Sequence, residues 1–163
     1  MKKLTTPISD EEILSLDVGD QVYISGEIFT GRDAALPQLV ELIKENKLDF
    51  NIQGSAIVHT AVSDAGIAPT TSNKEEIEST IPFLSKNGVK IHIGKGMLHD
   101  DTIVSLKENN SIFVITPPVA ALLTSKVLKK ECVAFSNEGM EAMYKLEVEN
   151  IPGIVAVSNG RSI

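Results

Sequence analysis

The sequence has no tryptophan, and aromatic residues of all kinds make up only 4% of its 163 residues. Proteins that bind single-stranded nucleic acid stack the bases on such side chains. The formal net charge of −7 also opposes binding to phosphate backbones, which need basic surfaces. We therefore expect no nucleic-acid partner, and an acidic ligand would need a local cluster of basic residues.

Residues that bind metals are also scarce. Cys132 is the only cysteine, which excludes an internal disulfide and is too few ligands for an iron–sulfur cluster or a structural zinc. The apolar segment Glu131–Phe135 predicts a strand in which this thiol is buried and inert. His59, His92 and His99 lack the i, i+4 spacing of metal ligands, so no metal site is predicted. The first two lie inside expected strands, packed and hydrogen-bonded, while His99 is the freer candidate for proton transfer.

Long apolar runs are missing as well. No stretch approaches the ~20 apolar residues of a membrane span. The polar residues after Met1-Lys2-Lys3 do not form a signal peptide, so we expect a cytoplasmic protein. With 42% hydrophobic residues, the chain is large and apolar enough to form one domain over residues 1–163.

Short β-type runs alternate with amphipathic helical segments along the chain. This alternation predicts an α/β fold with a mainly parallel or mixed sheet flanked by helices. A capping box of Ser72 and Glu75 starts one helix, and Pro82 is expected to kink or divide it. The expected strands are 21–26, 56–62, 89–93, 111–116 and 131–135, with further extended segments at 147–149 and 153–158; the expected helices are 10–14, 34–47, 72–87, 100–108 and 117–129. Ser9 is the expected cap of the first helix, and Asp100 or Asp101 that of the helix at 100–108.

Three of these strands end in loops that carry glycine, threonine or basic residues. Arg32 follows the first strand, Lys74 lies after the second, and Lys95 follows the third. Ligands gather at the carboxyl ends of parallel strands, so these cations could converge on a small ligand with two acidic groups. Simpler interpretations stay open: Asp33 can be an ordinary helix cap, Thr70-Thr71-Ser72 another, and the basic side chains merely solvated.

Several ordered motifs resemble one family, the beta subunits or C-terminal domains of class I fumarases and L-tartrate dehydratases. The resemblance covers nearly the whole chain, and a set of motifs in order is more specific than any single one. The motifs are Leu4-Thr5-Thr6-Pro7-Ile8, Thr30-Gly31-Arg32-Asp33-Ala34-Ala35, Pro69-Thr70-Thr71-Ser72, Ile93-Gly94-Lys95-Gly96 and Gly139-Met140-Glu141-Ala142.

This resemblance implies a swivelling β/β/α domain that docks on a larger alpha subunit, in an α2β2-type assembly. The alpha subunit's cysteines would hold a [4Fe–4S] cluster, and this chain alone would bind no cofactor. The shared active site would reversibly hydrate a small dicarboxylate, with fumarate and malate first and tartrate as the alternative. No turnover is expected without the partner.

The resemblance also implies roles for single residues. Arg32 would bind a substrate carboxylate, assisted by Thr71 and Lys74. Lys95 would stabilise developing negative charge, and Thr70 would accept the proton.

Three positions near this expected pocket depart from the family pattern. Lys74 stands where arginine is usual, Leu36 where histidine is expected, and His99 where a serine is usual. These departures leave two alternatives to a fumarate or tartrate enzyme. One is a divergent subunit that acts on another organic acid, and the other is a non-catalytic acid-binding or scaffolding module of the same fold.

Overall fold

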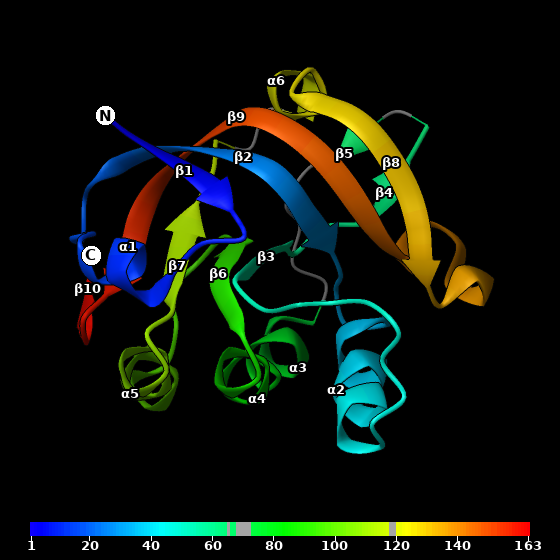
Figure 1. Cartoon of the computed structure of the whole chain (residues 1–163), viewed down its shortest axis with the longest axis horizontal. Helices are drawn as coiled ribbons and strands as arrows, with labels where there is room; N and C mark the ends of the chain where they lie inside the picture. The colour runs from blue at the N-terminus through cyan, green and yellow to red at the C-terminus, as the bar shows by residue number, and fades with distance from the viewer. Residues whose placement is uncertain (65, 68–72, 118–119) are drawn as a thin grey trace.

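The structure is a computed structural model that describes every residue except 65, 68–72 and 118–119. In the described part of the chain, an eight-stranded mixed sheet curves around an apolar interior, with helices on one side and a small two-stranded hairpin beside it (Figure 1). The expected α/β class with a mixed sheet is therefore confirmed.

The strands are β1 Lys2–Thr6, β2 Gln21–Thr30, β3 Ser55–Val58, β4 Val62–Ser63, β5 Gly66–Ile67, β6 Val89–Gly94, β7 Ile112–Ile115, β8 Val127–Ala134, β9 Met143–Ser158 and β10 Arg161–Ser162. The helices are α1 Asp10–Leu14, α2 Leu36–Lys44, α3 Lys74–Glu78, α4 Ile81–Lys86, α5 Asp100–Glu108, α6 Ala120–Thr124 and the 3₁₀ helix η1 Ser136–Glu141.

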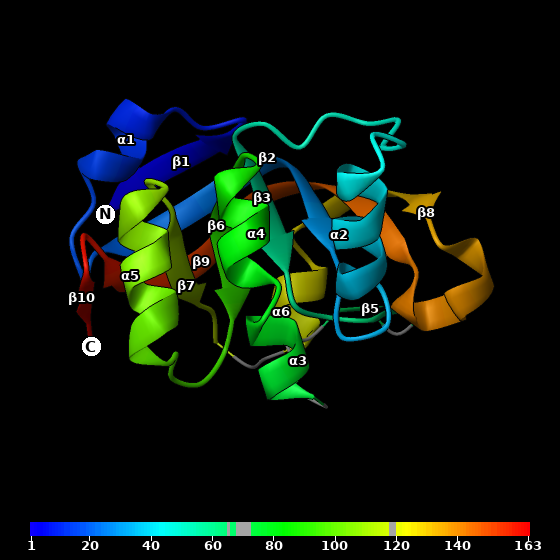
Figure 2. The ribbon, with the colours of Figure 1, turned by 90° about the horizontal axis from the view of Figure 1, so that it is seen from below.

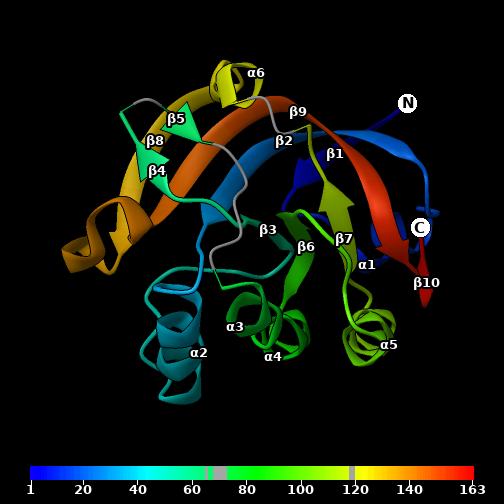
Figure 3. The same ribbon diagram turned by 180° about the vertical axis from the view of Figure 1, so that it is seen from behind.

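The last long strand, β9, turns the sheet into a partly closed barrel. The strands β1, β2, β3, β6 and β7 run parallel to their neighbours. The antiparallel strand β9 pairs with β2 along one part and with β7 along another, which closes a ring of five strands. The first residues of β9 also pair with β8, on the edge opposite β2. Figure 3 shows β9 arching over this ring with β8 beside it.

Two apolar layers follow from the alternation of side chains along the strands. In β3, the side chains of Ala56 and Val58 face the interior of the ring, where the largest cluster of buried residues lies. Ile57 points the other way, into a second cluster formed with residues of α2, α3 and α4. Figure 2 shows α2, α4 and α5 lying across this outer face of the sheet. Because both faces of β3 are buried, its residues Ala56–Val58 are apolar without a break.

Several expected boundaries are confirmed. Ser9 caps α1, since its hydroxyl accepts a hydrogen bond from the Glu12 backbone N–H at 3.2 Å. The segment 72–87 is divided as predicted into α3 and α4, with Pro82 in the first turn of α4, where its missing N–H costs little.

Other boundaries are corrected. The first strand continues to Thr30 because Ile28 and Phe29 also pair with β9 and are buried. The second strand ends at Val58 rather than residue 62. The helix expected at 117–129 ends at Thr124, and residues from Val127 onward form β8 because they pair with β9. The two extended segments near the end of the chain are a single strand, β9.

Three predicted caps and one predicted burial are also corrected. Ala35 precedes α2 without a side-chain cap, so Asp33 does not cap that helix. Asn73 is the N-cap of α3; Ser72 lies outside the described residues. His99, rather than an aspartate, precedes α5. Cys132 is exposed, because both faces of the central residues of β8 are uncovered.

Candidate active site

The neighbouring strands β2, β3 and β6 end at one edge of the sheet. Arg32 lies just after β2, the buried His59 just after β3, and Lys95 just after β6. The Gly31 N–H donates to the Val58 carbonyl at 3.0 Å, and the His59 N–H donates to the Ile93 carbonyl at 2.8 Å. Arg32 follows Gly31, and Lys95 follows Gly94. Since adjacent strands lie about 4.8 Å apart, the backbones of Arg32 and Lys95 are roughly 10 Å apart, with His59 between them.

Arg32 is held by a carboxylate from the other end of the chain. Its Nε donates to Glu141 Oε1 at 2.9 Å, and the two side chains are only 16% and 29% exposed. A second contact in the same place, between Gln38 Nε2 and Glu138 Oε2 at 2.8 Å, also joins η1 to the loop and helix after β2. The guanidinium therefore lies in a fixed, partly buried position at the carboxyl edge.

The loop of Arg32 is tied to the start of α3. The Asp33 carboxylate accepts a hydrogen bond from the Asn73 side-chain amide at 2.8 Å. This contact explains why Asp33 does not cap α2, because its oxygen is used across the site instead. It also brings Lys74, the residue after Asn73, toward the Arg32 loop.

Lys74 and Lys95 line the same small cavity, which has a volume of about 10 Å³. The Lys74 ammonium also donates to the Met97 carbonyl, so α3 is anchored on the turn after β6. The expected convergence of cations from different strand ends is thus seen for these two lysines. The remaining residues that line the cavity are His59, Ile77, Glu78, Ile81, Leu98 and Phe113.

Glu78 is a buried carboxylate in this cavity wall, and the sequence reasoning did not single it out. It is 4% exposed. Its Oε2 accepts hydrogen bonds from the His99 backbone N–H and from the Thr102 hydroxyl, both at 2.7 Å. These bonds fix the carboxylate against the first turn of α5, where the helix dipole favours a negative charge.

His99 lies on the outer side of this group. Its Nε2 is 2.8 Å from Glu75 Oε1, and its side chain is 63% exposed. The hydrogen bond to Glu75, helped by the charges of Glu78 and Glu75, raises the pKa of His99. Its backbone is fixed near the cavity, but its imidazole is not among the side chains that line it.

Two other histidines are buried. His92 Nε2 is 2.8 Å from the Ser85 hydroxyl, which confirms that it is packed and hydrogen-bonded. Burial, together with the neighbouring His59, lowers the pKa of His92 to about 3. Burial also lowers the pKa of His59 to about 4. Within the described residues, His59 Nε2 has no hydrogen-bond partner. His59 is therefore packed, as predicted, but this nitrogen lacks the hydrogen bond that was predicted for it.

The other predicted site residues, Thr70 and Thr71, lie outside the described residues, and Leu36 lies in the core. Leu36 is fully buried in the cluster between the sheet and α2, with its side chain packed under Gly31, so it is a core residue. Among the described residues, no group of three or more histidine, cysteine, aspartate or glutamate side chains is placed to hold a metal ion. No helix in the described ranges has the length and apolar character needed to cross a membrane.

Comparison with known proteins identifies the family. The model of the family described as "Fumarase C-terminus" matches residues 2–163. The chain belongs to this family. An Escherichia coli K12 protein named L(+)-tartrate dehydratase subunit beta is 31% identical, over 96% of this chain and 83% of that protein. A Methanocaldococcus jannaschii protein with the same name, given provisionally, is 34% identical, over 96% of this chain and 87% of its own.

A longer relative shows the same family in another arrangement. A Geobacillus stearothermophilus protein, provisionally named fumarate hydratase class I, is 30% identical over 98% of this chain but only 33% of its own length. The predicted membership in the fumarase and tartrate dehydratase family is confirmed by these matches.

The sequence pattern does not predict that three further residues, Glu141, Glu78 and His59, belong to the site. Glu141 was noticed only as part of the Gly139-Met140-Glu141-Ala142 motif, and Glu78 only as part of a helix. His59 was interpreted as a packed strand residue. One signal was available for His59, because it directly follows the apolar run of β3 and so lies at the carboxyl end of a strand. For the two glutamates, the partners are far away in sequence.

Proposed function

We propose that this chain is the beta subunit of a hydro-lyase that reversibly adds water to, or removes it from, a four-carbon dicarboxylate. Fumarate with malate, and tartrate, are the two candidate substrate pairs. The relatives that match over most of their own length are named as tartrate dehydratase subunits, which favours a separate subunit of this kind. The longer relative named as a fumarate hydratase keeps fumarate as a candidate.

The observation that carries the proposal is the group of cations at the carboxyl edge. Lys74 and Lys95 line one cavity, and Arg32 follows the strand two places away in the sheet. The chain as a whole has a formal net charge of −7, so an acidic ligand would depend on these three side chains for its attraction. Such a group can hold a dianion against an otherwise repelling surface.

Each residue then has a defined task. Arg32, oriented by Glu141, binds one substrate carboxylate, and a planar guanidinium suits this because it can donate two parallel hydrogen bonds. Lys74 and Thr71 assist that binding. Lys95 stabilises the negative charge that develops when the proton next to a carboxylate is removed. Thr70 accepts that proton, with its hydroxyl activated by the nearby cations, and His99 exchanges protons with solvent.

The iron–sulfur cluster of this reaction is assigned to the partner subunit. The described donor set of this chain does not fit a cluster, since Cys132 is its only cysteine and lies exposed on β8. We propose a larger alpha subunit that supplies every cluster ligand, an α2β2-type complex, and a cytoplasmic location. The carboxyl edge of the sheet would face that subunit.

Anaerobic copurification and assay test this proposal. The chain should bring down a larger, cysteine-bearing partner with iron and sulfide, and the complex should turn over malate, fumarate or tartrate. Arg32→Ala and Lys95→Ala should each lower kcat/KM by about 100-fold, the worth of a charge-assisted hydrogen bond.

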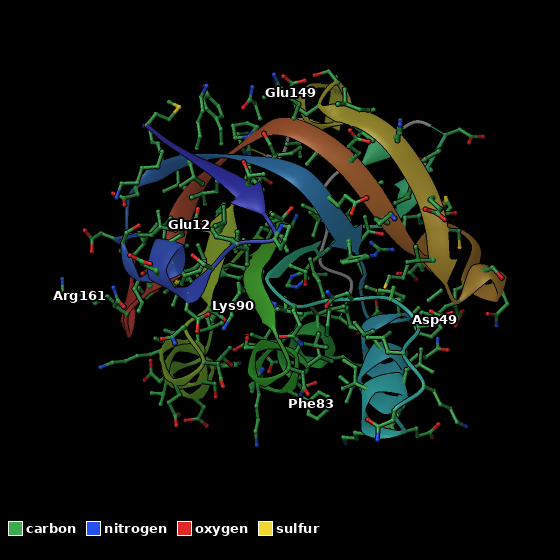
Figure 4. All side chains as sticks on the ribbon, viewed as in Figure 1. Glu12, Asp49, Phe83, Lys90, Glu149 and Arg161 are labelled. Carbon is green, nitrogen blue, oxygen red and sulfur yellow. The ribbon has the colours of Figure 1, made fainter. Side chains whose placement is uncertain are left out.

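Lys90→Ala is the matched control. Lys90, labelled in Figure 4, lies at the opposite end of β6 and pairs with Asp10 at 2.8 Å. Its removal should leave turnover unchanged. A copurified complex that is iron-free, or one in which Arg32→Ala and Lys95→Ala turn over like the parent, would overturn the assignment. A partner bound without any turnover of the three acids would favour either the divergent subunit that acts on another acid or the non-catalytic module.

A further inference from the structure

Two buried polar atoms have no hydrogen-bond partner among the described residues, and both belong to residues that line the same cavity. They are His59 Nε2 and Glu78 Oε1, and both residues are 4% exposed. Buried polar atoms in proteins are nearly always hydrogen-bonded, because an unpaired one has lost its water and gained nothing. Two such atoms on one cavity wall point to a ligand that satisfies both.

The size of the cavity limits that ligand to one atom. Its volume of about 10 Å³ is close to the minimum that holds a single water-sized oxygen. Apolar side chains, including Ile77, Leu98 and Phe113, form much of the rest of its lining. Lys74 and Lys95 also line it, so an oxygen in this place is adjacent to the cations of the proposed active site.

The chemistry of the two atoms defines the kind of oxygen. Glu78 as a carboxylate only accepts hydrogen bonds, and its Oε2 is already used by His99 N–H and the Thr102 hydroxyl. The oxygen must therefore donate to Glu78 Oε1, which a substrate carboxylate cannot do. His59 is neutral at physiological pH because burial keeps its pKa near 4, so its Nε2 either donates one hydrogen bond or accepts one.

We infer that this cavity is a binding site for one O–H oxygen, held between His59 Nε2 and Glu78 Oε1 at the base of the active site. Two sources share this chemistry: a hydroxyl group of the bound hydroxy acid, and a water molecule. The hydroxyl source rests on the proposed function, whereas the water source does not. A hydroxyl has one hydrogen, so it requires His59 to donate from Nε2, while water fits either tautomer.

The glycine at the end of β6 leaves space for the His59 ring. Gly94, at the end of β6, has no side chain, and a Cβ there would lie 2.7 Å from His59 Nδ1. The His59 ring is therefore packed directly against the strand, with its ring centroid 6.3 Å from that of Phe113. The imidazole is fixed by packing, and its Nε2 is the atom left for a ligand.

Crystal structures of the native complex, without substrate and with L-malate or tartrate, are the deciding experiment. We expect an oxygen at about 2.6–3.2 Å from both His59 Nε2 and Glu78 Oε1. An oxygen present in both forms identifies water, and one that belongs to the acid identifies the substrate hydroxyl. If neither structure has an oxygen there, the inference is overturned, whatever the activity of the complex.

A pair of variants of similar size separates the two sources in solution. His59→Gln keeps a hydrogen-bonding nitrogen near the position of Nε2, and His59→Met removes it. For a substrate hydroxyl, the Met variant should raise the KM for the hydroxy acid at least about tenfold over the Gln variant, with the KM for the unsaturated acid within about twofold. For water, the two acids respond alike.

Discussion

The rings of His59 and His92 are buried together, with 6.3 Å between their centroids. Their pKa values in the folded chain are about 4 and about 3, below the ordinary 6.5, because burial disfavours the charged ring. The unfolded chain therefore takes up protons first as the pH falls. The free energy of unfolding therefore does not depend on these rings above pH ~6.5. It falls progressively as the pH is lowered from there to the folded pKa values.

We predict acid sensitivity of the free energy of unfolding from these two rings. Each contributes a slope of up to about 1.4 kcal/mol per pH unit between about pH 6 and pH 4. Urea unfolding at several pH values in this range measures the slope. His59→Gln removes one titrating ring and should reduce the slope by about half. A wild-type stability that does not change over this range would contradict the assignment.

The ion pair of Arg32 and Glu141 is the second feature at this scale. We predict that Glu141→Gln raises the KM of the complex about fivefold or more, because the guanidinium loses the charge that holds its Nε edge. The change in stability should stay under about 1 kcal/mol, since the pair is partly exposed.

Glu138→Gln is the control for that variant. Glu138 lies on the same 3₁₀ helix but bonds Gln38 instead of Arg32. Its KM should be that of the wild type. Equal kinetics of the Glu141 and Glu138 variants would show that Arg32 does not need its partner.

At the scale of elements, the sequence was informative where one residue decides the local structure. Ser9 and Pro82 start helices where expected, because a cap and a missing N–H act within one turn. Sequence failed where a distant strand decides. The local pattern predicts a helix through residues 127–129, but these residues belong to β8, which pairs with β9. Asp33 has the sequence pattern of a helix N-cap, but its carboxylate accepts a hydrogen bond from the side chain of Asn73 instead.

The candidate site shows the same division. The strand-end rule predicts from the sequence that Arg32, Lys74 and Lys95 lie at one edge of the sheet. The rule says nothing about which side chains from other elements meet them. Glu141 reaches Arg32 from 109 residues away, and Glu78 reaches Thr102 from 24 residues away. Those contacts exist only after β9 and α5 have packed.

The strand β8 allows a further prediction. It pairs with β9 alone, and most of its central residues, including Cys132, are exposed. The thiol of the isolated chain should therefore react with a disulfide reagent such as DTNB under native conditions, in a yield of one per chain and at nearly the rate seen in urea. A thiol that reacts only after unfolding would contradict this exposure.

At the scale of the whole molecule, β9 is the strand on which closure depends. Leu146 in β9 is fully buried in the interior cluster, whereas Ile154 in the same strand is 43% exposed. We predict that Leu146→Ala lowers the free energy of unfolding by about 2–5 kcal/mol, from lost burial and the cavity left behind. Chemical unfolding of the two alanine variants measures the difference.

Ile154→Ala is the matched control because it removes a similar side chain from the same strand. Its cost should be about 1 kcal/mol or less, since the side chain already meets solvent. Equal losses for the two variants would mean that β9 contributes through its hydrogen bonds and not through the interior that it closes.

The position of β9 in the chain order has a consequence for biosynthesis. The strands β2, β7 and β8, which it joins, leave the ribosome earlier, so the ring cannot be sealed until residue 158 is available. Until then the exposed rims of β2 and β7 can pair with other chains. We therefore expect a nascent chain that has not yet completed β9 to aggregate more readily than the folded domain.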